Sequence, residues 1–218
     1  MAYLTKLNNE AVALFGDRRC PLALEKFHEA LCQMREIMNA SSQHDPPRCH
    51  EGGSQEAGRT HAVLPYQNQE GTAEDMFLYF NGIVLKETLE QHPSTFAICC
   101  AATLFNCAVI YHMEGVATQK MSFMDKALHM YQASLHFLQG VDLQNDTCLL
   151  VALAATNNMA QIELEKGMVD GANRRLYHTY ALLQHSKTRA LDMFAGSEIH
   201  GFLLNSSLQG KITSAAAA

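Results

Sequence analysis

Residues 4–30 read LTKLNNEAVALFGDRRCPLALEKFHEA, and this stretch contains two apolar patterns separated by Gly16 and Asp17. Within each pattern the apolar residues recur every three or four positions, which is the spacing of an amphipathic helix. Pro21 suits the first turn of the second helix, because its missing N–H leaves no hydrogen bond unmade there. We therefore expect two antiparallel helices joined by a short turn.

The arrangement of small and large residues in this stretch recurs twice further along the chain. Each copy begins with Asn, any residue and Ala. A second small residue follows later in the copy, then a large residue four positions after it and a third small residue seven positions after it. The copies start at Asn9, Asn106 and Asn158. In the middle copy seven more residues separate the two halves, so we expect an enlarged turn at residues 116–123. A recurrent helix–turn–helix unit is typical of an α-solenoid.

These copies predict an all-α fold, a short right-handed α-solenoid of helical hairpins that forms a single domain over residues 1–218. We place the repeats at about residues 3–38, 96–139 and 147–194. A solenoid needs an element that covers its last apolar face, and we assign this role to a C-terminal capping helix at residues 197–209. Residues 210–218 are expected to fray.

Two stretches between the first and second copies differ from the helical pattern. Residues 39–73 are rich in Ser, Gly and Pro, and they predict a long, flexible, disordered insertion. Residues 74–91 contain FLYF-NG-IVLK, which is compatible with a β-hairpin because Asn-Gly favours a two-residue turn. We favour a small extended segment here, with a helix as the alternative.

The spacing of small residues in the copies resembles that of the tetratricopeptide-repeat (TPR) family. In that family a small residue near the middle of the first helix is followed by a small residue in the second helix, then an aromatic residue and another small one. In the first copy this order is met by Ala11, Ala23, Phe27 and Ala30. The third copy has Leu176 in the aromatic position and Thr179 in the last small position. The chain departs from the family in its insertion, in its enlarged middle turn and at Glu163, where the family often has an aromatic residue.

The resemblance implies a partner-binding site. In the family, the first helix of each repeat lines a concave groove, and an Asn in that helix hydrogen-bonds an extended peptide. An amide can donate to a peptide C=O and accept from a peptide N–H at the same time. The residues of this chain at or beside these positions are Asn9, Asn106, Asn158, Asn8, Phe105, Asn157, Val12, Val109 and Gln161. The alternative is that the Asn side chains only tie one helix to the backbone of its neighbour.

The groove that the resemblance implies contains little charge. Some members of the family grip a carboxylate-ended tail with Lys and Arg. In this chain only Lys6 lies nearby in the first copy, and the corresponding stretches AATLFNCAVIYHM and ALAATNNMAQIEL contain neither residue. We therefore expect a polar and apolar groove that takes a protein or peptide partner.

The bulk composition argues against several other classes of partner. A net charge of −6 and a pI near 6.0 give no basic surface for nucleic acid. No run reaches the roughly 18 apolar residues of a membrane span, and the N-terminus lacks the features of a secretory signal. The seven cysteines, most of them within helical patterns, indicate free thiols in a reducing compartment. We expect an intracellular protein, cytoplasmic or nuclear, that binds neither nucleic acid nor membrane.

Candidate catalytic and metal-binding residues fit those functions poorly. Cys99 and Cys100 lie in an apolar helical pattern, without a neighbouring cation that would lower a thiol pKa. Residues of the types that bind zinc lie in the predicted insertion without the paired spacing of a zinc site. They are His44, Cys49, His50 and His61. We expect no enzyme activity, no cofactor and no metal.

The sequence therefore favours a protein–protein interaction module or scaffold. The alternative is a regulatory or oligomerisation subunit in which the solenoid is mainly structural. An exposed apolar face at residues 197–209 would then mediate assembly. The sequence does not specify the oligomeric state.

Overall fold

The structure is a computed structural model that describes residues 1–41, 76–86, 93–194 and 196–208. These residues form eight α-helices and no β-strand, so the described part of the chain is all-α, as the sequence predicted. The helices are α1 (Ala2–Gly16), α2 (Cys20–Ser41), α3 (Pro93–Thr118), α4 (Met121–Phe137), α5 (Asp146–Glu165), α6 (Val169–His185), α7 (Lys187–Met193) and α8 (Gly196–Ser207).

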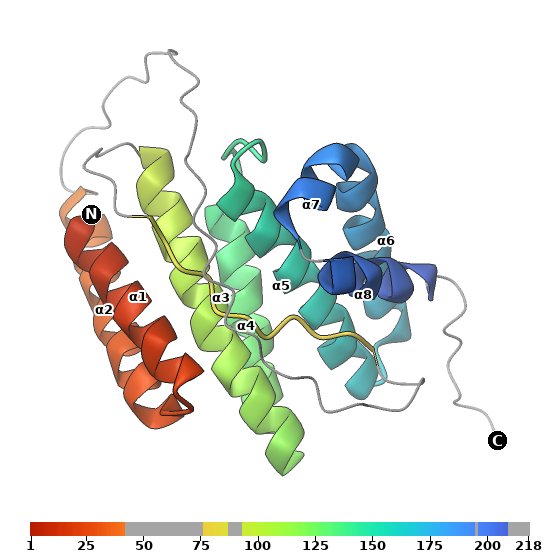
Figure 1. Ribbon diagram of the computed structural model, residues 1–218. Coiled ribbons are helices and arrows are strands. Elements are labelled where there is room, and N and C mark those ends of the chain that lie inside the picture. The colour runs from red at the N-terminus through yellow and green to blue at the C-terminus, as the bar shows by residue number, and fades with distance from the viewer. Residues whose placement is uncertain (42–75, 87–92, 195, 209–218) are drawn as a thin grey trace.

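Three helix pairs follow one another through the molecule in chain order (Figure 1). α1 packs against α2, α3 against α4 and α5 against α6, and each pair contacts the next through α2 with α3 and α4 with α5. The first helices of the three pairs also touch one another, α1 with α3 and α3 with α5. These three helices therefore lie together on one side of the molecule. α8 contacts α5 and α6 and follows α5 on that side. We call this side, formed by α1, α3, α5 and α8, the ladder face.

Small residues lie where the helices of a pair approach closely. Ala11 and Ala23 are completely buried in the first pair, beside the equally buried ring of Phe27. In the second pair, a Cβ atom on Gly115 of α3 would lie 2.7 Å from Cγ of Met124 in α4. The absence of larger side chains at these positions lets the helices pack at short distance, and large rings fill the adjacent space.

The middle pair has no enlarged turn, so the expectation for residues 116–123 is wrong. α3 continues to Thr118 and α4 begins at Met121. The chain reverses between them with Gln119 in the left-handed region at φ 52°. The additional residues therefore lengthen the helices, and α3 has 26 residues where α1 has 15.

Residues 76–86 are extended, as the sequence favoured, but they form neither a hairpin nor the alternative helix (Figure 1). The segment passes through Asn81 and Gly82 without a turn. Asn-Gly promotes a hairpin only where the flanking strands can pair with each other. Here the backbone groups on both sides of Asn-Gly bond to side chains of the helices instead.

Several expectations concern residues outside the described part of the chain. They include the predicted tail at 210–218, residues 74–75 and 87–91 beside the extended segment, and the insertion from residue 42 to residue 73. The start of that insertion is corrected, because residues 39–41 belong to α2.

Among the described helices, α3 alone is long and apolar enough to cross a membrane by length and composition. Its most apolar 18-residue window has a mean hydropathy of 1.7, and 67% of that window is buried inside the protein. The core helix of a soluble protein has the same properties, so the composition of α3 is a weak argument for a membrane segment.

Candidate functional site

One asparagine from each of four helices makes the same pair of hydrogen bonds with the extended segment at residues 76–86. In each pair the side-chain N–H donates to a backbone C=O, and the side-chain oxygen accepts from the N–H of the same residue. The pairs are Asn9 with Leu85, Asn106 with Ile83, Asn158 with Tyr79 and Asn205 with Phe77. The eight donor–acceptor distances lie between 2.6 and 2.9 Å. We call these four asparagines the asparagine ladder.

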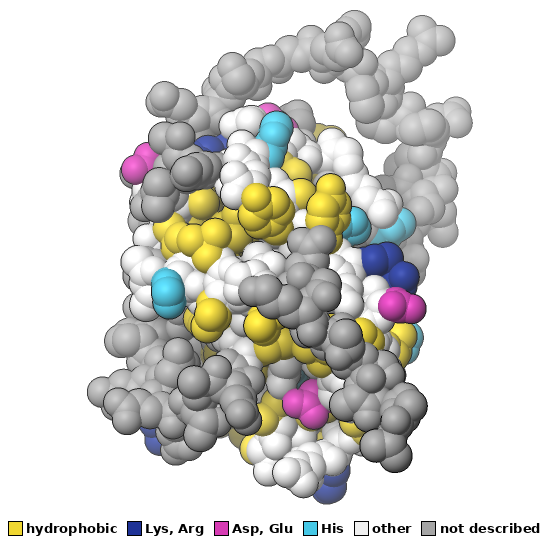
Figure 2. All heavy atoms as spheres, turned by 90° about the vertical axis from the view of Figure 1, so that its right-hand side faces the viewer, with side chains coloured by type: hydrophobic (Ala, Val, Ile, Leu, Met, Phe, Trp, Pro, Cys, Tyr) yellow, Lys and Arg dark blue, Asp and Glu magenta, His cyan; other side chains and the backbone are white. Residues whose placement is uncertain are grey.

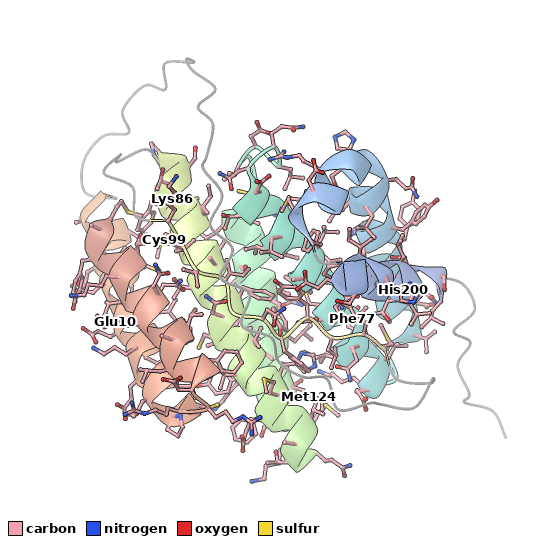
Figure 3. All side chains as sticks on the ribbon, viewed as in Figure 1. Glu10, Phe77, Lys86, Cys99, Met124 and His200 are labelled. Carbon is pink, nitrogen blue, oxygen red and sulfur yellow. The ribbon has the colours of Figure 1, made fainter. Side chains whose placement is uncertain are left out.

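The segment runs across the ladder face in the direction opposite to the order of the helices. Phe77 lies at α8, and Lys86 lies at the other end, beside α1 and α3 (Figure 3). Consecutive ladder contacts fall two, four and two residues apart along the segment. Asn81 and Gly82 occupy the longer interval, between the contacts of α5 and α3.

Two further asparagines, Asn8 and Asn157, bond both to the ladder and to the segment. Asn8 donates to the carbonyl of Ile83 at 3.0 Å, and Asn157 donates to the carbonyl of Phe77 at 2.9 Å. Asn8 accepts from Asn106 at 2.9 Å, and Asn157 accepts from Asn205 at 2.7 Å. Asn8 and Asn157 are completely buried. These bonds fix the orientation of the ladder amides, since each amide group has a defined partner for its donor and its acceptor.

The other residues that the sequence placed at the site have different surroundings. Phe105 faces the segment, and its ring centroid lies 6.2 Å from that of Tyr79. Val12 lies beneath Gly82, where an added Cβ would come within 2.7 Å of its Cγ1. Val109 is buried in the helical core. Gln161 bonds to His112 and Glu165, and no hydrogen bond joins it to the described part of the segment.

Asn158 also begins a chain of hydrogen bonds that leads into the core. Its side chain donates to the Tyr131 hydroxyl at 3.1 Å, and that oxygen lies 3.4 Å from Nδ1 of His112. Nε2 of His112 lies 2.6 Å from Oε1 of Gln161, which can only accept, so Nε2 carries the proton and Nδ1 accepts from the tyrosine. Burial lowers the pKa of His112 to about 4 and raises the pKa of Tyr131 above its ordinary range. The imidazole is therefore neutral at neutral pH.

The side chains of the segment contribute to the hydrophobic core. Tyr79 is 3% exposed, Ile83 4% and Leu85 8%. Tyr79 stacks on Phe202 of α8 at a centroid distance of 5.9 Å, and Phe77 meets the same ring edge-on at 5.2 Å. The ladder thus satisfies the backbone of a segment whose alternate side chains are removed from water.

Asn205 is a member of the ladder that the sequence did not predict, because residues 197–209 have the pattern of a capping helix. The sequence nevertheless contains a signal for it. Asn205 and Ser207 repeat the Asn-x-small pattern, with Ser in place of Ala. The Asn-x-small pattern therefore includes the fourth member of the ladder, although it also matches Asn39 and Ser41.

The described residues show no arrangement suited to covalent or metal chemistry. Burial raises the pKa of the Cys99 thiol to about 11 and that of the Cys100 thiol to about 12, so the nucleophilic thiolate is scarce at neutral pH. No group of three or more His, Cys, Asp or Glu side chains in this part of the chain is placed to hold a metal ion. The candidate zinc ligands of the predicted insertion lie outside it. What the ladder face does is bind an extended main chain.

No protein-family model, no curated protein and no solved structure matches this chain.

Proposed function

We propose that this protein is a TPR-like α-solenoid that acts as a protein–protein interaction module or scaffold. Three features of the fold support the TPR-like assignment: consecutive helix pairs, small residues at the crossings and first helices that share one side of the molecule. In this proposal the ladder face is the floor of the concave groove, and the partner is an extended protein segment. The function is binding, without catalysis, cofactor or nucleic acid.

The observation that carries the proposal is the bidentate contact of four asparagines with four backbone positions of one segment. Contacts of this kind recognise the main chain, so they are available to any extended segment of suitable shape. The net contribution of one hydrogen bond to stability is about 0.5–1.5 kcal/mol, and the ladder makes several such bonds with a segment in a single register. Residues 76–86 are a bound example that the chain itself supplies.

A partner must compete with residues 76–86 for the ladder. A tethered segment acts at an effective concentration on the order of millimolar, because its binding is intramolecular. We therefore propose that a partner binds by displacing this segment. The opposing possibility is that residues 76–86 are a permanent part of the core and that the ladder is structural.

The test uses the full chain with a weakened internal segment. Leu85→Asp puts a charge at a position that is only 8% exposed and so disfavours the bound state of residues 76–86. A fluorescent peptide with the native sequence MFLYFNGIVLK is then titrated against this variant, and its anisotropy is measured. We expect saturable binding, and at least tenfold weaker binding when Asn158→Ala is added.

A peptide of the same composition in scrambled order is the matched control, and circular dichroism establishes that each variant is helical. Absence of peptide binding by a folded Leu85→Asp chain would assign the ladder a purely structural role.

A second candidate function is self-association through the C-terminal end. α6 and α8, which touch each other, expose Tyr177, Tyr180, Leu203 and Leu204, each more than 40% accessible. Figure 2 shows hydrophobic side chains at the surface of this end of the molecule. If this face mediates assembly, Leu203→Glu with Leu204→Glu lowers the mass measured by light scattering. Leu22→Glu, at an exposed leucine of α2, leaves it unchanged.

We also propose an intracellular location, in the cytoplasm or nucleus. The six cysteines of the described residues are free thiols, which supports a reducing compartment.

A further inference from the structure

The ladder fixes the register of the bound segment, and the register determines which side chain meets which part of the ladder face. Four backbone contacts allow no slip along the helices without breaking all of them. Selectivity between segments must therefore come from the fit of side chains at fixed positions. The contacts of residues 77–85 define six such positions.

The first position requires an aromatic ring that packs against a glycine. A Cβ atom on Gly201 of α8 would lie 2.2 Å from Cγ of Phe77 and 2.4 Å from its Cδ2. The ring therefore lies directly against the backbone of α8, with Phe202 edge-on at 5.2 Å. Gly201 leaves a flat space that a planar side chain fills.

The second position is also aromatic. The Tyr79 ring is nearly parallel to that of Phe202, with an interplanar angle of 17°, and tilted at 51° to that of Phe105. Stacked and tilted ring pairs stabilise the bound segment beyond the area that they bury. An aliphatic residue here would lose both ring contacts.

The third position requires glycine. A Cβ atom on Gly82 would lie 2.7 Å from Cγ1 and 3.4 Å from Cγ2 of Val12. Val12 is 2% exposed, and its β-branched side chain has little rotational freedom within a helix. Any residue larger than glycine would displace either the segment or α1.

The aliphatic positions exclude charge. Ile83 and Leu85 are buried, and an unpaired charge at either would be strongly disfavoured. Between them and the aromatic pair, the Asn81 amide donates to Oε1 of Glu198 at 2.8 Å. An acidic residue in place of Asn81 would face that carboxylate without a proton to donate.

We infer that the ladder face selects partner proteins that present an extended segment of the pattern aromatic-x-aromatic-x-Asn-Gly-aliphatic-x-aliphatic. This inference rests on the proposed function and adds the chemistry of the ligand. Residues 77–85 display the pattern as Phe, Tyr, Asn, Gly, Ile and Leu. Val12 determines the glycine position, and Gly201 determines the first aromatic position.

The experiment compares two labelled peptides on the full-length Leu85→Asp chain. One has the native sequence MFLYFNGIVLK, and the other has Ala at the position of Gly82. We expect at least tenfold weaker binding of the Ala peptide. Adding Val12→Ala to the protein removes the methyl groups that the new Cβ would meet, so the two peptides should then bind within about twofold of each other.

The outcomes separate this inference from the proposed function. If the native peptide binds and the Ala peptide binds equally well, the specificity pattern is overturned while peptide binding stands. If neither peptide binds a folded protein, the proposed function fails and the inference with it. If Leu85→Asp does not fold, Gly82→Ala in the full chain serves instead, since the clash with Val12 weakens the internal segment directly.

Light scattering on the wild-type chain identifies the source of the segment. A dimer that dissociates when the native peptide is added would assign the ladder to residues 76–86 of a second copy, and would overturn the assignment to a different protein. A monomer that binds peptide supports a partner protein.

Discussion

At the scale of the residue, the primary amide of asparagine presents a donor and an acceptor side by side, the complement of one residue of an extended chain. Asn106 uses both groups on Ile83, and a second N–H reaches Asn8. Asn106 is 1% exposed, so water cannot replace its bonds. Asn9 makes the same contact with Leu85 but is only partly buried.

We predict that Asn106→Ala lowers the free energy of unfolding by about 2–3 kcal/mol, because it leaves the buried N–H of Ile83 without a partner. Asn9→Ala is the matched control, with a loss of about 1 kcal/mol or less because water reaches the freed groups. Urea denaturation measures both. Equal losses for the two variants would contradict the difference in burial.

His112 gives the stability a dependence on pH. Its pKa is about 4 in the folded protein and has an ordinary value of 6.5, so the unfolded chain binds the proton more readily. Stability is therefore highest above pH 6.5 and falls as the pH decreases toward 4, by a total of about 3 kcal/mol. We predict that His112→Gln, which can still donate to Gln161, removes this fall in urea denaturation between pH 7.5 and 4. A wild-type slope that persists in the variant would show that other groups cause it.

The residue scale is also where the sequence was most informative. Asn9, Asn106 and Asn158 were identified from their recurrence before Ala, which reflects the close packing of helices beside the ladder. Their partner within the described residues is a segment of the same chain. Recurrence of asparagine in a helical repeat indicates that a main chain is bound, but it does not indicate whose main chain it is.

At the scale of the element, helix pairs were predictable and helix lengths were not. The composition of residues 116–123 fits both a polar turn and the continuation of two helices. The sequence therefore does not decide which of these contains the additional residues of the middle copy. In the structure residues 116–118 extend α3 and residues 121–123 belong to α4, and Gly115 lets the two helices approach at that end.

Gly115→Ala tests the close approach of α3 and α4. Helix propensity alone would stabilise the variant by about 1 kcal/mol. The new Cβ would, however, lie 2.7 Å from Cγ and 3.1 Å from the backbone N of Met124, and overpacking of this kind costs about 1–3 kcal/mol. We predict a net loss of about 1 kcal/mol in thermal or chemical denaturation. A gain would mean that the two helices separate easily at this point.

Local signals favoured an extended conformation for residues 76–86 but did not indicate its hydrogen-bond partners. FLYF-NG-IVLK has the composition of a hairpin. In a two-stranded hairpin the backbone hydrogen bonds would form between the two halves of the segment itself. Its actual partners lie on four helices distributed over most of the chain. Local sequence contains no information about such partners, so the conformation follows from tertiary structure.

At the scale of the whole molecule, the segment connects all three helix pairs and α8. The ladder contacts join residues 76 positions apart at α1 and 128 positions apart at α8. Contacts between residues so far apart in the sequence form at a cost in loop-closure entropy. We therefore expect the segment to bind after the helices have packed.

Site-resolved hydrogen exchange of the backbone amides of residues 77–85, measured by NMR on the native protein, tests the ladder most directly. We predict alternating protection along the segment. The ladder-bonded amides are those of Phe77, Tyr79, Ile83 and Leu85. They should exchange slowly, whereas those of Leu78 and Val84, which make no hydrogen bond within the described residues, should exchange fast. Asn106→Ala should accelerate the exchange of the Ile83 amide more than that of any other amide of the segment. Equal rates for Ile83 and Val84 in the wild-type protein would contradict the binding of this segment by the asparagine ladder.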